Sequence, residues 1–257
     1  MARTLDQAKH TAKRNQILDA AYQLVYTKGF ELMTIQDILT DLGISKGAFF
    51  HYFPSKRDLL EGLIERMLNE IEQVLTPIIT DSHLSAVQKL ERYFDVAQQW
   101  KSERKTILLG ILRAWYQDEN ALLRQKMFAA STQRVSPHLA QIIRQGNQEG
   151  TWSCDYPNET AMMILYLLQG FSDSITEKLL SSTSQLDESW LTRSLQAYTS
   201  AVERVLGAAP HTLHILNTQD LAVWFDQNRS STEPPRENSK ASQTFQRQDE
   251  LKEEERL

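Results

Sequence analysis

The side chains best suited to chemistry in this chain lie around two lysines, and that chemistry is contact with an anion. Lys46 stands between Ser45 and Gly47, at the start of a short helix pattern. Lys56 follows Ser55, which is positioned to cap the next helix. Free backbone N–H groups at a helix N-terminus, together with the Lys56 ammonium, form a small anion site that suits one DNA phosphate.

Residues 34–53 have the pattern of two short helices joined by a turn. Thr34 can cap the first helix with Asp37 as its capping-box partner, and Gly43 suits a left-handed position after it. Ser45 can cap the second helix. The first helix has apolar residues at i, i+3, i+4 and i+7, namely Ile35, Ile38, Leu39 and Leu42. The spacing predicts a helix-turn-helix whose second helix enters the major groove of DNA with its N-terminal residues.

The charge distribution is compatible with DNA contact at one end of the chain. The 257 residues have a net charge of -5, but residues 1–60 hold eight Lys/Arg and six Asp/Glu, and the acidic excess lies after them. Lys9, Lys13 and Arg14 crowd the start of the first helix pattern, as a phosphate clamp or as a solvated cluster. The basic charge is therefore local.

Composition and periodicity predict an all-α fold, with 41% apolar residues, 9 glycines and 7 prolines. We expect a DNA-binding domain in residues 1–54 and a helical sensor and dimerisation domain in residues 55–207, with 55–76 as the connector helix ending before Pro77. A possible extra helix spans 208–228, and 229–257 has the composition of a disordered tail. Within the second domain, a kink or break is expected at Pro137.

Nothing in the sequence predicts export or membrane insertion. The single cysteine, Cys154, excludes an intramolecular disulfide, and the N-terminus has no apolar segment of the kind found in signal peptides. The longest wholly apolar run, residues 161–168, is far shorter than the roughly 20 residues of a membrane span. A cytoplasmic location without membrane contact is expected.

The segment GISKGAFFHYFPSKRDLL, preceded by TIQDILTDL and YTKGF, resembles the tetracycline-repressor (TetR) family of bacterial transcription regulators over roughly residues 12–70. The resemblance implies an N-terminal three-helix helix-turn-helix domain followed by a C-terminal helical ligand-binding and dimerisation domain. The positions that it assigns to contact with double-stranded DNA are Thr34, Ser45, Lys46, Gly47, Phe50, His51, Tyr52 and Lys56. Phe50 departs from the common tyrosine and lacks the hydroxyl that could bond a phosphate, which leaves van der Waals contact.

The resemblance also implies a homodimer. Residues 159–180 and 187–206 are two consecutive amphipathic helices, which in that family pair with their counterparts in a second subunit. The alternative is that these apolar stripes pack within the chain. A dimer matches a palindromic operator, because its two reading helices meet two half-sites.

A small-molecule effector is the remaining partner that the resemblance implies, in a cavity among the middle helices. The residues predicted to line this cavity are Trp100, Arg113, Trp115, Tyr116, Trp152, Tyr166 and Gln169. Aromatic residues at helical spacing are also typical of an ordinary core, so that interpretation stays open.

The sequence does not predict an enzyme, a cofactor or a metal site. His211 and His214 lack a close third ligand, and Cys154 lacks the positive neighbours that activate a thiol. The leading hypothesis is a dimeric, ligand-responsive repressor that leaves a palindromic operator when the effector binds. The alternative hypothesis is an all-helical dimeric scaffold for protein interactions that does not bind DNA.

Overall fold

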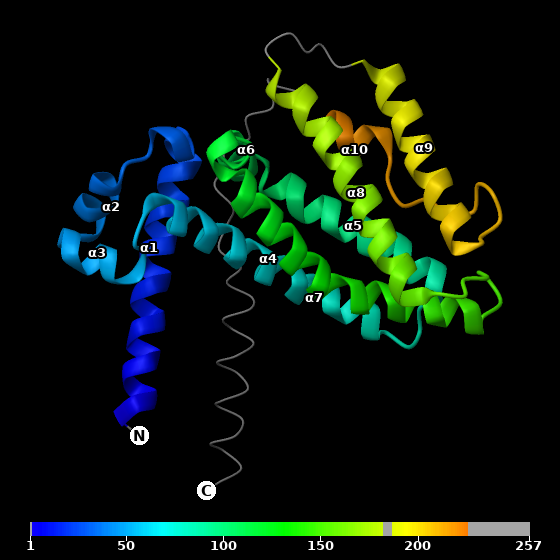
Figure 1. Cartoon of the computed structure of the whole chain (residues 1–257), viewed down its shortest axis with the longest axis horizontal. Helices are drawn as coiled ribbons and strands as arrows, with labels where there is room; N and C mark the ends of the chain where they lie inside the picture. Colours follow the sequence, from blue (N-terminus) through cyan, green and yellow to red (C-terminus); the bar gives the residue numbers. More distant parts are fainter. Residues whose placement is uncertain (1, 182–186, 226–257) are drawn as a thin grey trace, which may run out of the picture. The chain divides into compact units, whose positions relative to one another are not determined.

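The computed structural model describes residues 2–181 and 187–225, and the described residues form helices and connecting turns without any strand (Figure 1). The helices are α1 (Ala2–Leu32), α2 (Ile35–Leu42), α3 (Lys46–Tyr52), α4 (Lys56–Thr80), α5 (Ala86–Glu103), α6 (Lys105–Trp115), α7 (Ala121–Gln148), α8 (Pro157–Leu180), α9 (Glu188–Leu206) and α10 (Thr218–Ala222), with a 3-10 turn, η1 (Asp118–Asn120), before α7. The all-α prediction is confirmed. None of the described helices is long and apolar enough to cross a membrane.

The first three helices form a small unit around large apolar side chains. Phe49, in the middle of the short α3, and Phe53, directly after it, are 0% and 1% exposed and pack against residues of α1 and α4. Such a short helix has few contacts of its own, so these rings hold it in place. The long α1 is interrupted at Gly29, where φ is 79°.

The predicted caps of the helix-turn-helix are present. The Thr34 hydroxyl accepts a hydrogen bond from Asp37 N, and the Asp37 carboxylate accepts one from Thr34 N. Gly43 follows α2 in the left-handed region, with φ 59°, and the Ser45 side chain accepts from Ala48 N. Local sequence therefore determines where α2 ends and α3 begins.

The helix end predicted before Pro77 is wrong, and of the kink or break expected at Pro137 the break does not occur. The connector α4 continues through Pro77 to Thr80, and α7 runs from Ala121 to Gln148 with Pro137 inside it, so the chain does not break there. Each proline leaves the carbonyl four residues earlier without its helical donor. Those carbonyls belong to Gln73 and Gln133, which are exposed residues, so water can replace the missing donor.

The helices after α3 surround two further apolar clusters. The larger one joins α5, α7, α8 and α9 through residues such as Phe94, Ile143 and Val202, and a smaller one lies between α8, α9 and α10. Both amphipathic helices of residues 159–180 and 187–206 are present, with α8 starting two residues earlier at Pro157. The predicted boundary at 54/55 falls in the short link between α3 and α4.

The segment after α9 is mostly not helical, unlike the extra helix predicted for 208–228. Gly207 ends α9, and within the described residues 208–225 only Thr218–Ala222 forms a helix, α10. The buried Glu203 carboxylate accepts hydrogen bonds from Thr212 N at 2.9 Å and Leu213 N at 3.1 Å. Because these two backbone N–H groups bond the Glu203 carboxylate, they need no helical carbonyl partner, and the segment can be non-helical. The predicted tail, 229–257, lies outside the described residues.

Candidate nucleic-acid interface

The N-terminal end of α3 projects into solvent. Ser45, Lys46 and Gly47 are exposed, whereas Phe49, one turn further along the helix, is buried. The Lys46 ammonium lies 5.8 Å from the centre of the Phe50 ring, its only described contact with a side chain. This end of α3 therefore presents backbone N–H groups and a cation that the fold does not use.

Gly47 leaves space that the fold itself does not require. A Cβ atom at this position would meet only Ser45 Oγ, at 4.0 Å, and Gly47 has an ordinary helical backbone. Alanine would therefore fit the free protein. A glycine in a helix that neither packing nor conformation demands is consistent with close approach of another molecule's backbone.

Lys56 is placed differently from the sequence expectation. Its Nζ donates a hydrogen bond to the backbone carbonyl of Glu31 at 3.0 Å and lies 4.9 Å from the centre of the Phe30 ring. Burial lowers the pKa of this ammonium. Asp58 also brings a carboxylate to the first turn of α4. Lys56 thus joins α4 to the end of α1, and its contact with phosphate remains a prediction.

Thr34 also has its polar groups occupied. Its hydroxyl donates to Asp37 Oδ2 at 2.7 Å, and Lys28 Nζ lies 2.5 Å from the same oxygen. The hydrogen bond from Lys28, followed by those from Thr34, holds the pKa of the Asp37 carboxyl well below its usual range. A phosphate at this helix N-terminus would meet a carboxylate, so Thr34 is a less favourable contact than its position indicated.

The C-terminal half of α3 carries an aromatic cluster that includes a residue not selected from the sequence. The His10 ring of α1 lies 5.6 Å from the His51 ring and 4.7 Å from the Tyr52 ring, measured between ring centres. His51 is exposed, and Phe50 and Tyr52 are partly buried. Since His10 is far from α3 in the chain, no local spacing could identify it. The cluster extends the candidate interface onto α1.

Comparison with known proteins finds relatives for both parts of the chain. Residues 17–63, which run from within α1 through α2 and α3 into α4, match the bacterial regulatory proteins of the tetR family. Residues 114–180 match the tetracyclin repressor-like C-terminal domain. The chain belongs to the TetR family. It is therefore a TetR-family transcriptional regulator with a helix-turn-helix DNA-binding domain.

Individual TetR-family relatives align over much of this chain. An HTH-type transcriptional regulator of Bacillus subtilis, YfiR, is 28% identical over 144 residues, which are 54% of this chain and 69% of the relative. The nucleoid occlusion factor SlmA of Vibrio campbellii is 27% identical over 197 residues, 74% of this chain and 97% of the relative. A crystal structure of a transcriptional regulator from Cytophaga hutchinsonii has the same fold, with a TM-score of 0.56, 23% identity and coverage of 76% of this chain and 95% of that one.

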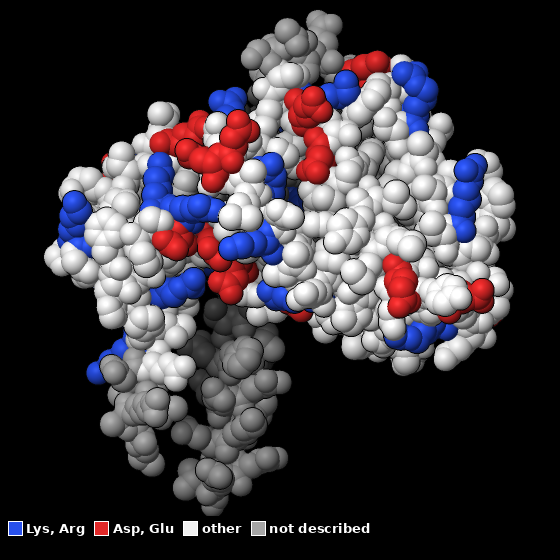
Figure 2. Space-filling model, viewed as in Figure 1, with Lys and Arg blue, Asp and Glu red and all other residues white. Residues whose placement is uncertain are grey.

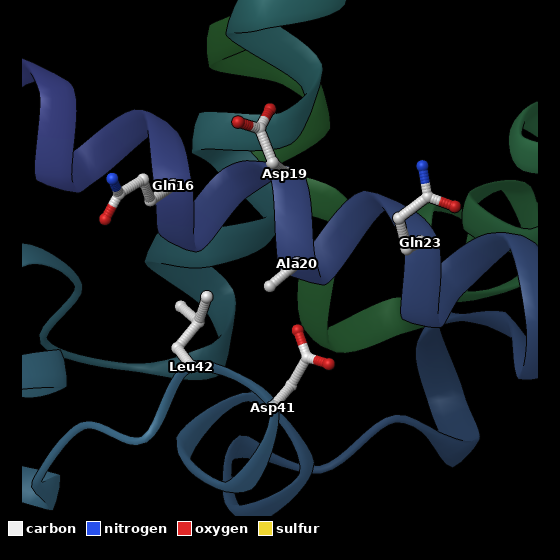
Figure 3. A pocket seen from close by; sticks show the side chains of 6 residues that line it. All are labelled: Gln16, Asp19, Ala20, Gln23, Asp41 and Leu42. Atoms are coloured by element: carbon white, nitrogen blue, oxygen red, sulfur yellow. The ribbon is translucent and has the colours of Figure 1, made fainter.

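A shallow hollow in the helix-turn-helix domain lies between α1 and α2 and does not suit a phosphate. Figure 3 shows its lining, which is Gln16, Asp19, Ala20, Gln23, Asp41 and Leu42. Two of these residues are acidic and none is basic, and Asp19 already pairs with Arg66 of α4. Its charge is therefore opposite to that of the N-terminal end of α3.

Among the residues predicted to line an effector cavity, Tyr116 and Gln169 meet at one acceptor. The Tyr116 hydroxyl donates to Asp173 Oδ1 at 2.5 Å, and Gln169 Nε2 donates to the same oxygen at 2.7 Å. Burial, together with the Asp173 hydrogen bond, raises the pKa of Tyr116 to about 12. This cluster links the end of α6 to α8.

The other predicted cavity residues do not gather at one place. Trp100 is buried in the apolar cluster that includes residues of α1 and α4. Trp152 is buried in the cluster that joins α5, α7, α8 and α9, where its ring packs against Gly146. Arg113 and Tyr166 are exposed, and Trp115 is partly buried against the first core. These positions give the two buried tryptophans a packing role, and the contact of all seven residues with a ligand remains a prediction.

Helix α8 of this TetR-family protein exposes an apolar face. Met162, Met163, Tyr166 and Leu167 are 38–55% exposed, and the Phe128 ring of α7 lies 5.1 Å from the Tyr166 ring. Figure 2 shows that the surface over α8 carries few charged side chains. An apolar face of this kind marks a contact surface.

Proposed function

We propose that this regulator is a homodimeric repressor that binds a palindromic operator through α3 and leaves it when a small molecule binds. The observation that carries the proposal is the exposed N-terminal end of α3, where Lys46 is free of ion pairs within the described chain and Gly47 leaves open space. A cation and unobstructed backbone N–H groups at a helix N-terminus suit the edge of a DNA groove.

The dimer interface of the proposal lies on α8 and the adjoining part of α7. The apolar stripe of α9, which includes Leu191, Leu195 and Val202, is buried within its own chain. Only the other faces of α9 are therefore accessible to a second subunit. The exposed face around Met163 and Tyr166 has no such cover among the described residues. A twofold axis through this face would present two copies of α3 to half-sites about 34 Å apart or at a related spacing.

Release of DNA in this proposal is transmitted through α6. Gly110 of α6 lies against α1 so closely that a Cβ there would come within 3.1 Å of both the side chain and the carbonyl oxygen of Val25. At its other end, α6 is tied to α8 through Tyr116 and Asp173. A shift of α8 relative to α6 would therefore move α1 and the reading helix.

A second candidate role comes from the similarity to nucleoid occlusion factors. SlmA of Vibrio campbellii aligns over 97% of its own length, including both the reading head and the helices behind it. In that role the protein would occupy many chromosomal sites, whereas a local repressor would occupy few. Mapping its chromosomal binding sites by immunoprecipitation distinguishes the two roles.

The test is a binding-site selection from random duplexes with the full chain. The repressor proposal predicts enrichment of one palindromic sequence by the wild type and no enrichment by Lys46→Ala. Lys126→Ala, which changes an exposed lysine of α7, is the matched control and should select the same palindrome. Failure of the wild type to enrich any sequence would favour the scaffold alternative.

A further inference from the structure

One half-buried lysine of α5 has no countercharge among the described residues. Lys101 of α5 is half-buried, and burial lowers the pKa of its ammonium, with no charged neighbour contributing. No described carboxylate pairs with it. An ammonium withdrawn from water without a countercharge is unfavourable, and such groups are enriched at binding sites.

Two buried polar side chains, one on α5 and one on α7, also lack partners. Gln98 and Thr132 are 7% and 4% exposed, and neither Gln98 Nε2 nor Thr132 Oγ1 has a hydrogen-bond partner among the described residues. A buried donor without an acceptor is unfavourable. Each of these groups is thus available to a ligand that brings acceptors.

Contacts with α4 place these side chains at one level of the bundle. Residues 69–70 of α4 meet Arg104, directly after α5, through an ion pair of 3.7 Å and Arg134 of α7 through a hydrogen bond of 2.8 Å. Lys101 and Thr132 are each within one helical turn of these contacts. Helices α5 and α7 therefore bring them to the same height, as the crossing of the three helices in Figure 1 allows.

The phase of α5 turns Lys101 toward the interior. Lys101 follows the buried core residues Leu90 and Phe94 by eleven and seven residues, spacings that return to the same helix face. Gln98 is four residues after Phe94 and lies on the adjoining part of that face. The ammonium and the amide thus lie on the side of α5 from which Leu90 and Phe94 enter the apolar cluster shared with α7, α8 and α9.

We propose that the effector is an apolar molecule with a carboxylate group, which binds between α5 and α7 with its carboxylate at Lys101, Gln98 and Thr132. The inference rests on the proposed function, because release by an effector gives this site its role. The ammonium supplies the countercharge, and the amide and hydroxyl donate to the carboxylate oxygens. None of these three residues is among the seven that the sequence predicted.

The test measures the melting temperature of the full chain with a panel of monocarboxylates, from benzoate to decanoate, each paired with its primary amide. The acids should raise the melting temperature, and the tightest acid should bind about tenfold or more tightly than its amide. Lys101→Met should abolish this response and raise the melting temperature without ligand, because it removes an unpaired buried charge. Lys126→Met is the matched control and should respond as the wild type does.

Three results would overturn the proposal: no acid in the panel shifts the melting temperature, acids and amides bind equally, or Lys101→Met retains the response. Should Lys101→Met fail to fold, Thr132→Val serves in its place, with a severalfold weaker response expected and an unchanged one contradictory. DNA binding is measured separately on the same samples. Normal binding to a selected duplex without any acid response refutes only the effector class, whereas absent DNA binding with an intact acid response refutes the repressor function.

Discussion

The Lys56 ammonium donates a hydrogen bond to the backbone carbonyl of Glu31 across 3.0 Å, which ties the first turn of α4 to the last turn of α1. The helix that enters the sensor region is thereby attached to the helix that supports α3. A lysine at this position has a structural role in addition to any contact with DNA.

Replacing Lys56 should therefore destabilise the protein. Lys56→Met removes the hydrogen bond and the cation contact with Phe30, which together should lower the free energy of unfolding by about 1–2 kcal/mol. Urea denaturation checks the change, with Arg57→Met, an exposed neighbour, as the control. If Lys56 served only to contact phosphate, both variants would unfold at the wild-type midpoint.

Gly47→Ala should separate stability from DNA binding. The added methyl group meets only Ser45 Oγ in the free protein, and alanine favours the helix by about 0.5–1 kcal/mol, so stability should hold or rise. Affinity for a selected duplex should fall about tenfold or more, because the methyl group separates α3 from the DNA. Thermal denaturation and fluorescence anisotropy on one preparation give both values, and undiminished affinity would place DNA elsewhere.

Asp37 should make the stability of the helix-turn-helix domain fall at acid pH. Because its folded pKa lies below its unfolded value, the stabilisation is present above the unfolded carboxyl pKa of about 3.9 and is lost as pH falls through that value toward the lower folded pKa. Asp37→Asn should be less stable than the wild type at pH 7, and the difference should narrow below about pH 4. Chemical denaturation across pH checks this, with Asp41→Asn as the control on the same helix. A difference that stays constant with pH would show that the carboxylate charge is not responsible.

The α8 face should carry the dimer. Tyr166→Arg introduces a charge at a residue that is 55% exposed in the single chain, so folding should be preserved while the dimer dissociates. Light scattering coupled to gel filtration checks the mass, with Gln36→Arg, a change at an exposed residue of α2, as a comparison. A Tyr166→Arg protein that stays dimeric would place the interface on another surface.

Local signals explain which parts of the fold the sequence predicted. The Thr34–Asp37 box, Gly43 and the Ser45 cap are encoded within a few residues of each other, and the structure confirms all of them. Pro77 and Pro137 misled the prediction, because the exposure of the carbonyl four residues earlier depends on tertiary packing.

Sequence reasoning found site residues only where neighbouring residues in the chain mark them. Lys46 is marked in the sequence by its place directly after the Ser45 cap, but the contact of Lys56 with Glu31 joins residues 25 apart, and His10 reaches α3 from a distant turn of α1. Lys101 resembles a surface lysine in the sequence, and only the packing of α4, α5 and α7 reveals that it lacks a partner.

The most direct test of the account is the affinity of wild-type and Lys46→Ala protein for the selected duplex at increasing salt concentration. We predict that the wild type binds with a steep salt dependence and that Lys46→Ala loses about tenfold or more in affinity at an unchanged melting temperature. Equal affinity and equal salt dependence of the two proteins would contradict the claim that α3 reads DNA with its exposed N-terminal end.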